Sequence, residues 1–216
     1  MNTDVNVYDE DYYMRGKETG KSLYENYTWR PELTIPMVAS MIRHLGIRLE
    51  DSILDFGCAR GYTVRAFREM GYDVWGYDTS KWAIDNADEL VKDYVKGDST
   101  LFTDETTHFD WIIAKDVLEH VENTADVIAD LMAYVKCGMF VVVPLSSVDG
   151  QKYVVPSYEE DVTHIHRLTL ATWARMFMKP GWSVNACYRV QGIKDNYYKE
   201  GWEMGNGFIT CRRMEK

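Results

Sequence analysis

The sequence predicts an α/β protein in which a mostly parallel, seven-stranded sheet lies between two layers of helices, as a three-layer sandwich. Short apolar runs alternate with segments of helical length, and strands that alternate with helices pair in parallel through crossover connections. The run Phe140–Val143 is apolar on both faces, as a central parallel strand must be. The last two runs, Trp182–Val190 and Phe208–Arg213, follow each other without an intervening helix, so we expect an antiparallel pair at the sheet edge.

Each element follows from a local pattern. Apolar residues recur every four positions from Pro31 to Leu45, and proline suits a first helical turn, so we expect a helix there. The other expected elements are strands at Ile53–Asp55, Asp73–Tyr77, Tyr94–Val95, Trp111–Ala114 and Met139–Val143, and helices at Tyr62–Met70, Trp82–Lys92, Thr124–Val135 and Leu170–Met178. The polar segment from Pro144 to Leu168 reads as a long loop, and loops of that length are usually functional.

Length and charge limit the classes of protein that the chain can represent. With 216 residues we expect a single domain, 1–216, in which residues 1–45 form an N-terminal arm and a helix. The formal net charge of −10 and the absence of a Lys/Arg-rich run make nucleic acid a disfavoured partner. We therefore expect a small-molecule substrate, and the oligomeric state is left open.

The cysteines and the length of the apolar segments indicate in which compartment of the cell to expect the protein. The four cysteines at 58, 137, 187 and 211 lie far apart, which is neither a zinc pattern nor a disulfide framework. No segment reaches the roughly 18 apolar residues that a membrane span requires. These features favour a cytoplasmic protein that is not embedded in a membrane.

A glycine-containing turn follows the first expected strand. The segment Asp55–Gly61 reads Asp-Phe-Gly-Cys-Ala-Arg-Gly, and two glycines between a strand and a helix allow the backbone to approach a ligand closely. Asp78 follows the second strand, where a carboxylate can accept both hydroxyls of a ribose, and Asp98 follows the third. Singly, each acid reads more often as a helix cap or turn former, but together they indicate an adenosine site at the carboxyl edge of a parallel sheet.

Four ordered motifs resemble those of the class I, Rossmann-like S-adenosylmethionine-dependent methyltransferases. They are Ile53–Gly61, Gly76–Asp78, Gly97-Asp98 and Phe109–Val121, the last of which contains Asp-Val-Leu-Glu-His-Val and is similar to the small-molecule branch. The resemblance covers about residues 40–145. It implies S-adenosyl-L-methionine as the cofactor.

The resemblance also implies a set of cofactor-binding residues. They are Asp55, Gly57 and Gly61 around the methionine part, Asp78 at the ribose, Asp98 and Ser99 near adenine, and Lys115, Asp116 and Val117 along the sulfonium side, with Cys58 and Thr79 as further cofactor-binding residues. The chain departs from the family pattern at Ala59, where a third small residue is usual, and at Thr79, where an apolar residue often packs on adenine. Arg60 is expected either to reach the cofactor carboxylate or to point into solvent.

Two histidines are the candidate catalytic residues. An oxygen or cationic nitrogen acceptor must lose a proton, and His120 and His164 are placed by the resemblance near the acceptor. The alternative for His120 is a structural role at the start of the next helix. Because His164 and His166 share a side of an extended segment, a metal pair is conceivable, but no set of carboxylates for a hard cation is apparent, so we expect no metal.

The N-terminal segment Ser22–Arg30 is rich in aromatic residues. One hypothesis is that it folds over the cofactor as a lid, with Arg30 or a tyrosine hydroxyl meeting the methionine carboxylate. The alternative is that these rings simply cover an edge of the core.

The sequence thus favours S-adenosylmethionine-dependent methyl transfer to the oxygen or nitrogen of a small polar acceptor, with a sugar or a nucleotide-linked sugar among the candidates. A non-catalytic cofactor-binding or scaffolding protein with the same fold is the alternative. A nicotinamide-dependent oxidoreductase is less favoured, because the loop reads Gly57-x-x-x-Gly61 and not Gly-x-Gly-x-x-Gly.

Overall fold

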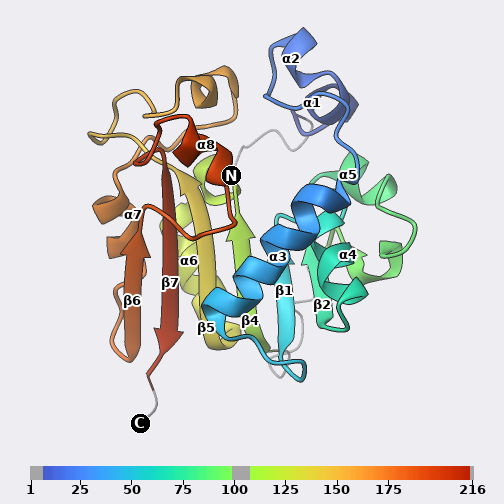
Figure 1. Ribbon diagram of the computed structural model, residues 1–216, viewed down its shortest axis with the longest axis vertical. Helices are drawn as coiled ribbons and strands as arrows, with labels where there is room; N and C mark the ends of the chain where they lie inside the picture. The colour runs from blue at the N-terminus through green and yellow to red at the C-terminus, as the bar shows by residue number, and fades with distance from the viewer. Residues whose placement is uncertain (1–6, 99–107, 215–216) are drawn as a thin grey trace.

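The computed structural model describes residues 7–98 and 108–214 (Figure 1). Its strands are β1 Ser52–Phe56, β2 Asp73–Tyr77, β3 Val95–Lys96, β4 Phe109–Lys115, β5 Val135–Pro144, β6 Trp182–Cys187 and β7 Asn206–Arg213. Its helices are α1 Glu10–Met14, α2 Gly16–Thr19, α3 Pro31–Leu45, α4 Tyr62–Glu69, α5 Lys81–Asp85, α6 Thr124–Ala133, α7 Leu170–Met176 and α8 Asp195–Lys199. Short 3₁₀ segments include η2 Lys92–Tyr94, η4 Leu118–His120 and η5 Pro156–Glu160.

The strands form one seven-stranded sheet in the order β3-β2-β1-β4-β5-β7-β6. Neighbouring strands from β3 to β5 are parallel, whereas β7 runs antiparallel to both β5 and β6. This topology confirms the predicted fold class, a mostly parallel α/β sandwich that ends in an antiparallel pair. The last strand of the chain lies inside the sheet, and β6 forms the edge.

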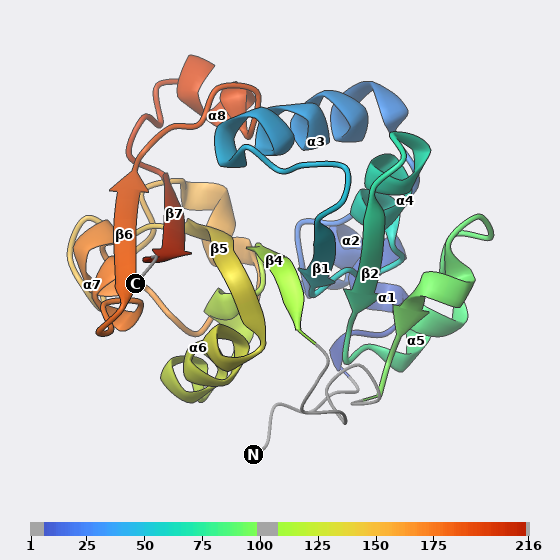
Figure 2. The ribbon, with the colours of Figure 1, turned by 90° about the horizontal axis from the view of Figure 1, so that it is seen from below.

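Helices cover both faces of the sheet. Figure 2 shows α3 and α4 on one face and α6 and α7 on the other. Because side chains alternate along a strand, Ile53 packs into the core with α3 and α4, while Leu54 packs into the core with α6 and α7. The two cores contain, respectively, Met41, Phe67, Ile113 and Phe140, and Ile112, Ile128, Met139 and Trp173.

Helix α3 has the ends that its sequence predicts. Pro31 lies in its first turn, and Gly46 caps its end in the left-handed conformation, with φ of 66°. Its observed bounds, Pro31–Leu45, are those expected. No helix in the part of the chain that the structure describes is long and apolar enough to span a membrane.

The prediction of a helix at Trp82–Lys92 is wrong for the second half of that segment. Helix α5 ends at Asp85, because Asp88 forms a turn in which its carboxylate accepts the Leu90 N–H at 3.0 Å. Asp88 also accepts a hydrogen bond from Arg65 of α4 at 2.8 Å. The hydrogen bonds of Asp88 therefore end the helix, despite the helical pattern of the segment.

Three segments carry more structure than their sequences indicated. The arm contains α1 and α2, the loop after Pro144 contains η5, and the stretch between β6 and β7 contains α8. An isolated bridge also pairs Ser146 with Tyr153 at the start of the long loop. Each helix is only four or five residues long, so tertiary packing decides its formation and periodicity gives little signal.

Candidate active site

The strand ends and the glycine turn meet at one edge of the sheet. Asp55 of β1 pairs in register with Gly76 of β2 and with Ile113 of β4, so these three strands end at the same level. The N–H groups of Gly57 and Cys58 both donate to the Tyr77 carbonyl, at 2.7 and 3.0 Å. The loop after β1 is thereby fixed to the end of β2.

Gly57 needs to be glycine for two reasons. Its φ of 82° lies in the left-handed region, and a Cβ at this position would come within 2.2 Å of the Val117 side chain. The loop and the end of β4 therefore approach each other closely. Ala59 also adopts a left-handed conformation, with φ of 48°, and so takes the geometry of a glycine without being one.

Asp78 and Asp55 are buried carboxyl groups beside this turn. The Asp78 oxygens accept the N–H groups of Ala59 and Ser80, both at 2.7 Å, which fixes the carboxylate while each oxygen keeps a lone pair for a ligand. Burial raises the pKa of Asp78, and these two hydrogen bonds oppose the rise. Burial also raises the pKa of Asp55 to about 7, although the positive charge of Lys115 opposes it.

Asp116 lies just past β4 between two lysines. Its carboxylate accepts hydrogen bonds from Lys115 Nζ and Lys194 Nζ, each at 2.5 Å. Burial alone would raise the pKa of Asp116, but the two ammonium groups hold it well below its usual value. Lys194 also donates to the Tyr158 hydroxyl at 3.1 Å and to Asn206 at 3.0 Å.

A cavity of about 710 Å³ opens at this edge of the sheet. Its lining comes from the strand ends, from the N-terminal arm, and from α6 and its surroundings. The strand ends contribute Phe56, Gly57, Ala59, Tyr77, Asp78, Thr79, Asp116 and Val117, and the arm contributes Tyr8, Tyr12, Tyr13 and Tyr24. The remaining lining residues are His120, Val121, Val127, Asp130, Leu131, Ala133 and Tyr134. The turn residues, the tyrosines of the arm and one candidate catalytic histidine thus share a single space.

The arm is attached to the rest of the molecule at several points around this cavity. Ser80 Oγ donates to the Tyr8 carbonyl at 2.6 Å, and Arg60 donates to the Tyr27 carbonyl at 3.0 Å. Tyr13 stacks on Trp82 with ring centroids 5.3 Å apart. Figure 1 shows α1 and α2, in blue, beyond the same edge of the sheet as α8.

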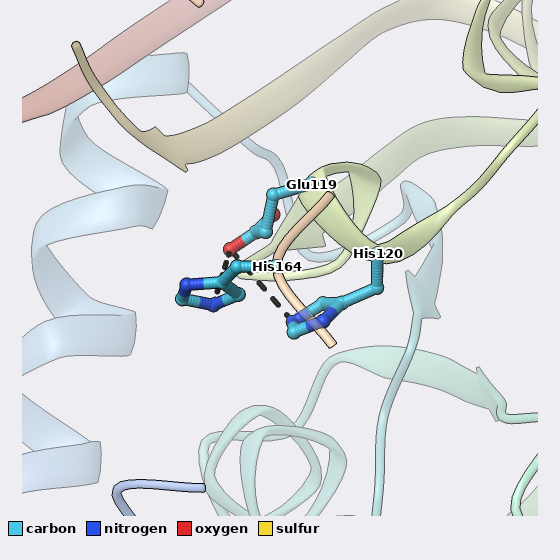
Figure 3. A group of neighbouring side chains, drawn as sticks. All are labelled: Glu119, His120 and His164. Atoms are coloured by element: carbon cyan, nitrogen blue, oxygen red, sulfur yellow. Dashed lines mark ion pairs between the residues drawn. The ribbon is translucent and has the colours of Figure 1, made fainter. Parts of the chain in front are cut away.

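His120, His164 and Glu119 form a cluster of neighbouring side chains (Figure 3), and His120 also lines the cavity. His164 Nε2 and His120 Nε2 lie 3.9 and 4.0 Å from Glu119 Oε1. Burial lowers the pKa of both histidines, that of His120 to about 4, and burial together with the charge of Asp116 raises the pKa of Glu119. Both imidazoles are therefore neutral at neutral pH.

The other nitrogen of each imidazole has a polar partner. His164 Nδ1 lies 2.8 Å from the Tyr158 carbonyl oxygen, and His120 Nδ1 lies 2.8 Å from Thr163 Oγ1. Thr163 Oγ1 in turn donates to Asp161 at 2.5 Å. Asp161 accepts a further hydrogen bond, at 2.8 Å, from the Tyr12 hydroxyl of the arm.

The predicted site residues divide into those that line the cavity and those that do not. Cys58 turns its side chain into the core against Gly76, so only its backbone belongs to the turn. Asp98 is exposed beyond β3, and Ser99 lies outside the described residues. Arg30 is exposed, pairs with Glu32 at 3.1 Å, and does not line the cavity. Arg60 donates hydrogen bonds to the carbonyl oxygens of Tyr27 and Asn86.

Two residues around the site escaped the sequence reasoning. Thr163 and Lys194 reach it from parts of the chain that carry no motif, and nothing in their local sequence marks them. Asp161 and Glu119 also lie beside the two histidines. Their position beside His120 and His164 depends on how the long loop folds back across the end of β4.

Comparison with known proteins places the chain in a family. A family model described as "Methyltransferase domain" matches residues 35–186, and the chain belongs to this family. A search of curated proteins found no match.

Solved structures match the fold at low sequence identity. The plantazolicin methyltransferase BpumL, in complex with a monoazolic desmethylPZN analog and SAH, matches with a TM-score of 0.62 and 16% identity over 85% of this chain and 84% of that chain. The 1,6-didemethyltoxoflavin-N1-methyltransferase of Burkholderia thailandensis matches with a TM-score of 0.59 and 18% identity over 85% and 80% of the two chains. Both likenesses support the Rossmann-like fold class.

Proposed function

We propose that the protein transfers a methyl group from S-adenosyl-L-methionine to an oxygen or nitrogen atom of a small polar acceptor. The observation that carries this proposal is the shared cavity, in which the glycine turn and Asp78 face the same space as His120 and the tyrosines of the arm. Membership of the methyltransferase domain family supports it, as do the matching methyltransferases that were solved with SAH, the product of the donor.

The strand-end residues would hold the donor. Asp78 would accept the ribose hydroxyls through the lone pairs that its backbone partners leave unused, and Asp55 would face the methionine ammonium group. Gly57 and Val117 would border the sulfonium side, where their close packing leaves room for no further side chain. Asp98, which follows β3, would lie near adenine.

The other side of the cavity would take the acceptor. Tyr8, Tyr12, Tyr13 and Tyr24 line it, and tyrosine rings stack well on flat or ring-shaped molecules, sugars and nucleotide-linked sugars among them. His120 lies in the cavity wall, and the His164 ring lies next to the His120 ring. Both would take part in removing the proton from the acceptor. The reaction is an in-line displacement, and the main task of the site is to align the two substrates and to exclude water.

Titration calorimetry with SAH and S-adenosylmethionine tests the donor site. We expect Asp78→Ala to weaken binding at least about tenfold, because the ribose hydroxyls lose a charged acceptor. Asp73→Ala is the matched control, since Asp73 begins the same strand at the opposite end and is exposed. Equal affinities of the two variants would contradict the assignment.

Turnover separates the enzyme from a non-catalytic binding protein. With methyl-labelled donor and a library of small acceptors, we expect label to appear in a sugar-like or aromatic acceptor and SAH to accumulate. A scaffold protein would bind SAH with the same dependence on Asp78 but would transfer label to no acceptor. Binding of NAD in place of SAH would favour the oxidoreductase alternative.

A further inference from the structure

Three electron-pair donors converge beside the cavity. One carboxylate oxygen of Glu119 and one nitrogen each of His120 and His164 all lie within 4.8 Å of one another (Figure 3). Glu119 is 1% exposed, and neither of its carboxylate oxygens has a hydrogen-bond partner within the described residues. A buried carboxyl group without a partner is costly, and native structures that contain one usually supply a water or an ion.

The partners of the two rings fix which nitrogen carries the proton. A carbonyl oxygen can only accept, so His164 Nδ1 must donate its proton to Tyr158. The hydroxyl proton of Thr163 is used on Asp161, so Thr163 Oγ1 accepts from His120 Nδ1. In both neutral rings the Nε2 atom is therefore left with a lone pair.

Both lone pairs belong to the atoms nearest the Glu119 carboxylate. The Nε2 to Oε1 distances of 3.9 and 4.0 Å are too long for a hydrogen bond, so a protonated Glu119 would not satisfy either ring. A cation between the three groups would satisfy the Glu119 oxygen and both lone pairs at once. We propose that Glu119, His120 and His164 bind a divalent transition-metal ion of the Zn²⁺ or Mn²⁺ class.

The donor set specifies this class of ion. Two imidazoles and one carboxylate suit zinc, manganese or iron, whereas Mg²⁺ and Ca²⁺ prefer oxygen ligands alone. Ligand atoms around a tetrahedral ion with bonds near 2.1 Å are roughly 3.4 Å apart, so the side chains would move inward by about 0.5 Å on binding. Proton donation from Nδ1 to a carbonyl or hydroxyl oxygen is the usual support of a metal-binding histidine, and both rings have it.

The site would leave one position open towards the cavity, because His120 also lines the cavity. This step rests on the proposed function: the hydroxyl oxygen of the acceptor binds the ion, which lowers the hydroxyl pKa. Its proton passes to water as the oxygen attacks the methyl carbon. The new O–C bond forms as the C–S bond breaks, and its electron pair returns to sulfur to give the neutral thioether SAH.

Metal binding is measured on the purified protein after treatment with EDTA. We expect a single Zn²⁺ ion to bind in competition with a chromophoric chelator, and Mn²⁺ to lose its free-ion EPR signal. Glu119→Gln keeps the shape and removes the charge, so it should weaken Zn²⁺ binding at least about 100-fold. His44→Gln is the matched control, because His44 lies on α3 beside Thr210. The proposal would be overturned if the unsubstituted protein bound neither ion, or if Glu119→Gln bound Zn²⁺ as tightly as the unsubstituted protein.

Two further readouts keep the test independent of folding and of turnover. Zn²⁺ should raise the melting temperature of the unmodified protein and of His44→Gln but not of Glu119→Gln, since only binding to the folded state stabilises it. Thr163→Val removes the support of His120 and should weaken Zn²⁺ binding about 10- to 100-fold. SAH binding without Zn²⁺ binding would overturn the metal site alone, whereas Zn²⁺ binding without SAH binding would overturn the proposed function.

Discussion

Asp55, which we propose as a donor-site residue, is subject to two opposing influences. Burial favours its neutral form, while Lys115 at the end of β4 favours the carboxylate, and the resulting pKa is about 7. A ligand that brings a positive charge beside Asp55 changes this balance. The proposed methionine ammonium group is such a ligand, so its binding should release a proton.

The affinity for SAH should therefore depend on pH. Because Asp55 must ionise to receive the ammonium group, affinity should rise roughly eightfold between about pH 6 and pH 7.5 and level off above the pKa. Asp55→Asn should bind weakly with no such rise. Calorimetry near pH 6 in two buffers of different ionisation enthalpy measures the proton release directly, and zero release would contradict this assignment.

Residues at strand ends were the part of the site that sequence could predict. Asp55, Gly57, Asp78 and Val117 lie at or just after the ends of strands that pair in a known order, so their meeting at one edge follows from the topology. Glu119 and His164 are different, because 44 intervening residues fold without a repeating pattern before the two side chains meet. Their convergence follows from loop packing, which a single sequence does not encode in any periodic way.

At the scale of elements, the arm is the part with the clearest functional consequence. Helices α1 and α2 are too short to be stable alone, and the arm is held by contacts to Ser80, Arg60, Trp82 and Asp161. Four of its tyrosines line the cavity. These contacts support the hypothesis that the arm acts as a lid, although Arg30 lies outside the cavity.

Deletion of residues 1–30 tests the lid hypothesis. We expect the remaining sheet to fold, as judged by circular dichroism, and the dissociation constant for SAH to rise at least about tenfold as the cavity loses its tyrosine wall. Tyr12→Phe keeps the ring but loses the hydroxyl contact to Asp161, so it should lose much less affinity. If the folded deletion protein bound SAH as tightly as the full chain, the rings would only cover the core.

Elements with a strong apolar pattern were predicted well, and the short helices α1, α2 and α8 were not. Helix α3 and the strands β1, β2, β4 and β5 have strong apolar patterns over lengths that fix their type. Helix α5 was predicted too long because an aspartate turn interrupts an otherwise helical pattern.

At the scale of the whole molecule, Lys194 joins parts of the chain that are far apart in sequence. Its ammonium group binds Asp116 after β4, Tyr158 in η5 and Asn206 at the start of β7. It is 11% exposed, so these contacts are shielded from most of the solvent.

Replacement of Lys194 should therefore affect stability more than a surface lysine does. Lys194→Met keeps the aliphatic length but leaves Asp116 with Lys115 alone, and we expect the free energy of unfolding to fall by about 1–3 kcal/mol. Lys81→Met removes an exposed ion pair with Asp85 and should cost less than about 0.5 kcal/mol. Urea unfolding measures both, and equal losses would contradict the bridging role.

The position of β7 has a consequence for synthesis of the chain. Among the described residues, strand β6 pairs only with β7, and β7 lies between β6 and β5. Until residues 206–213 have emerged from the ribosome, the hydrogen-bonding edge of β5 is open and β6 has no partner. Both strands then offer unpaired backbone groups that favour aggregation. Completion of the sheet must wait until residues 206–213 emerge, which makes the nascent chain most vulnerable shortly before its last strand arrives.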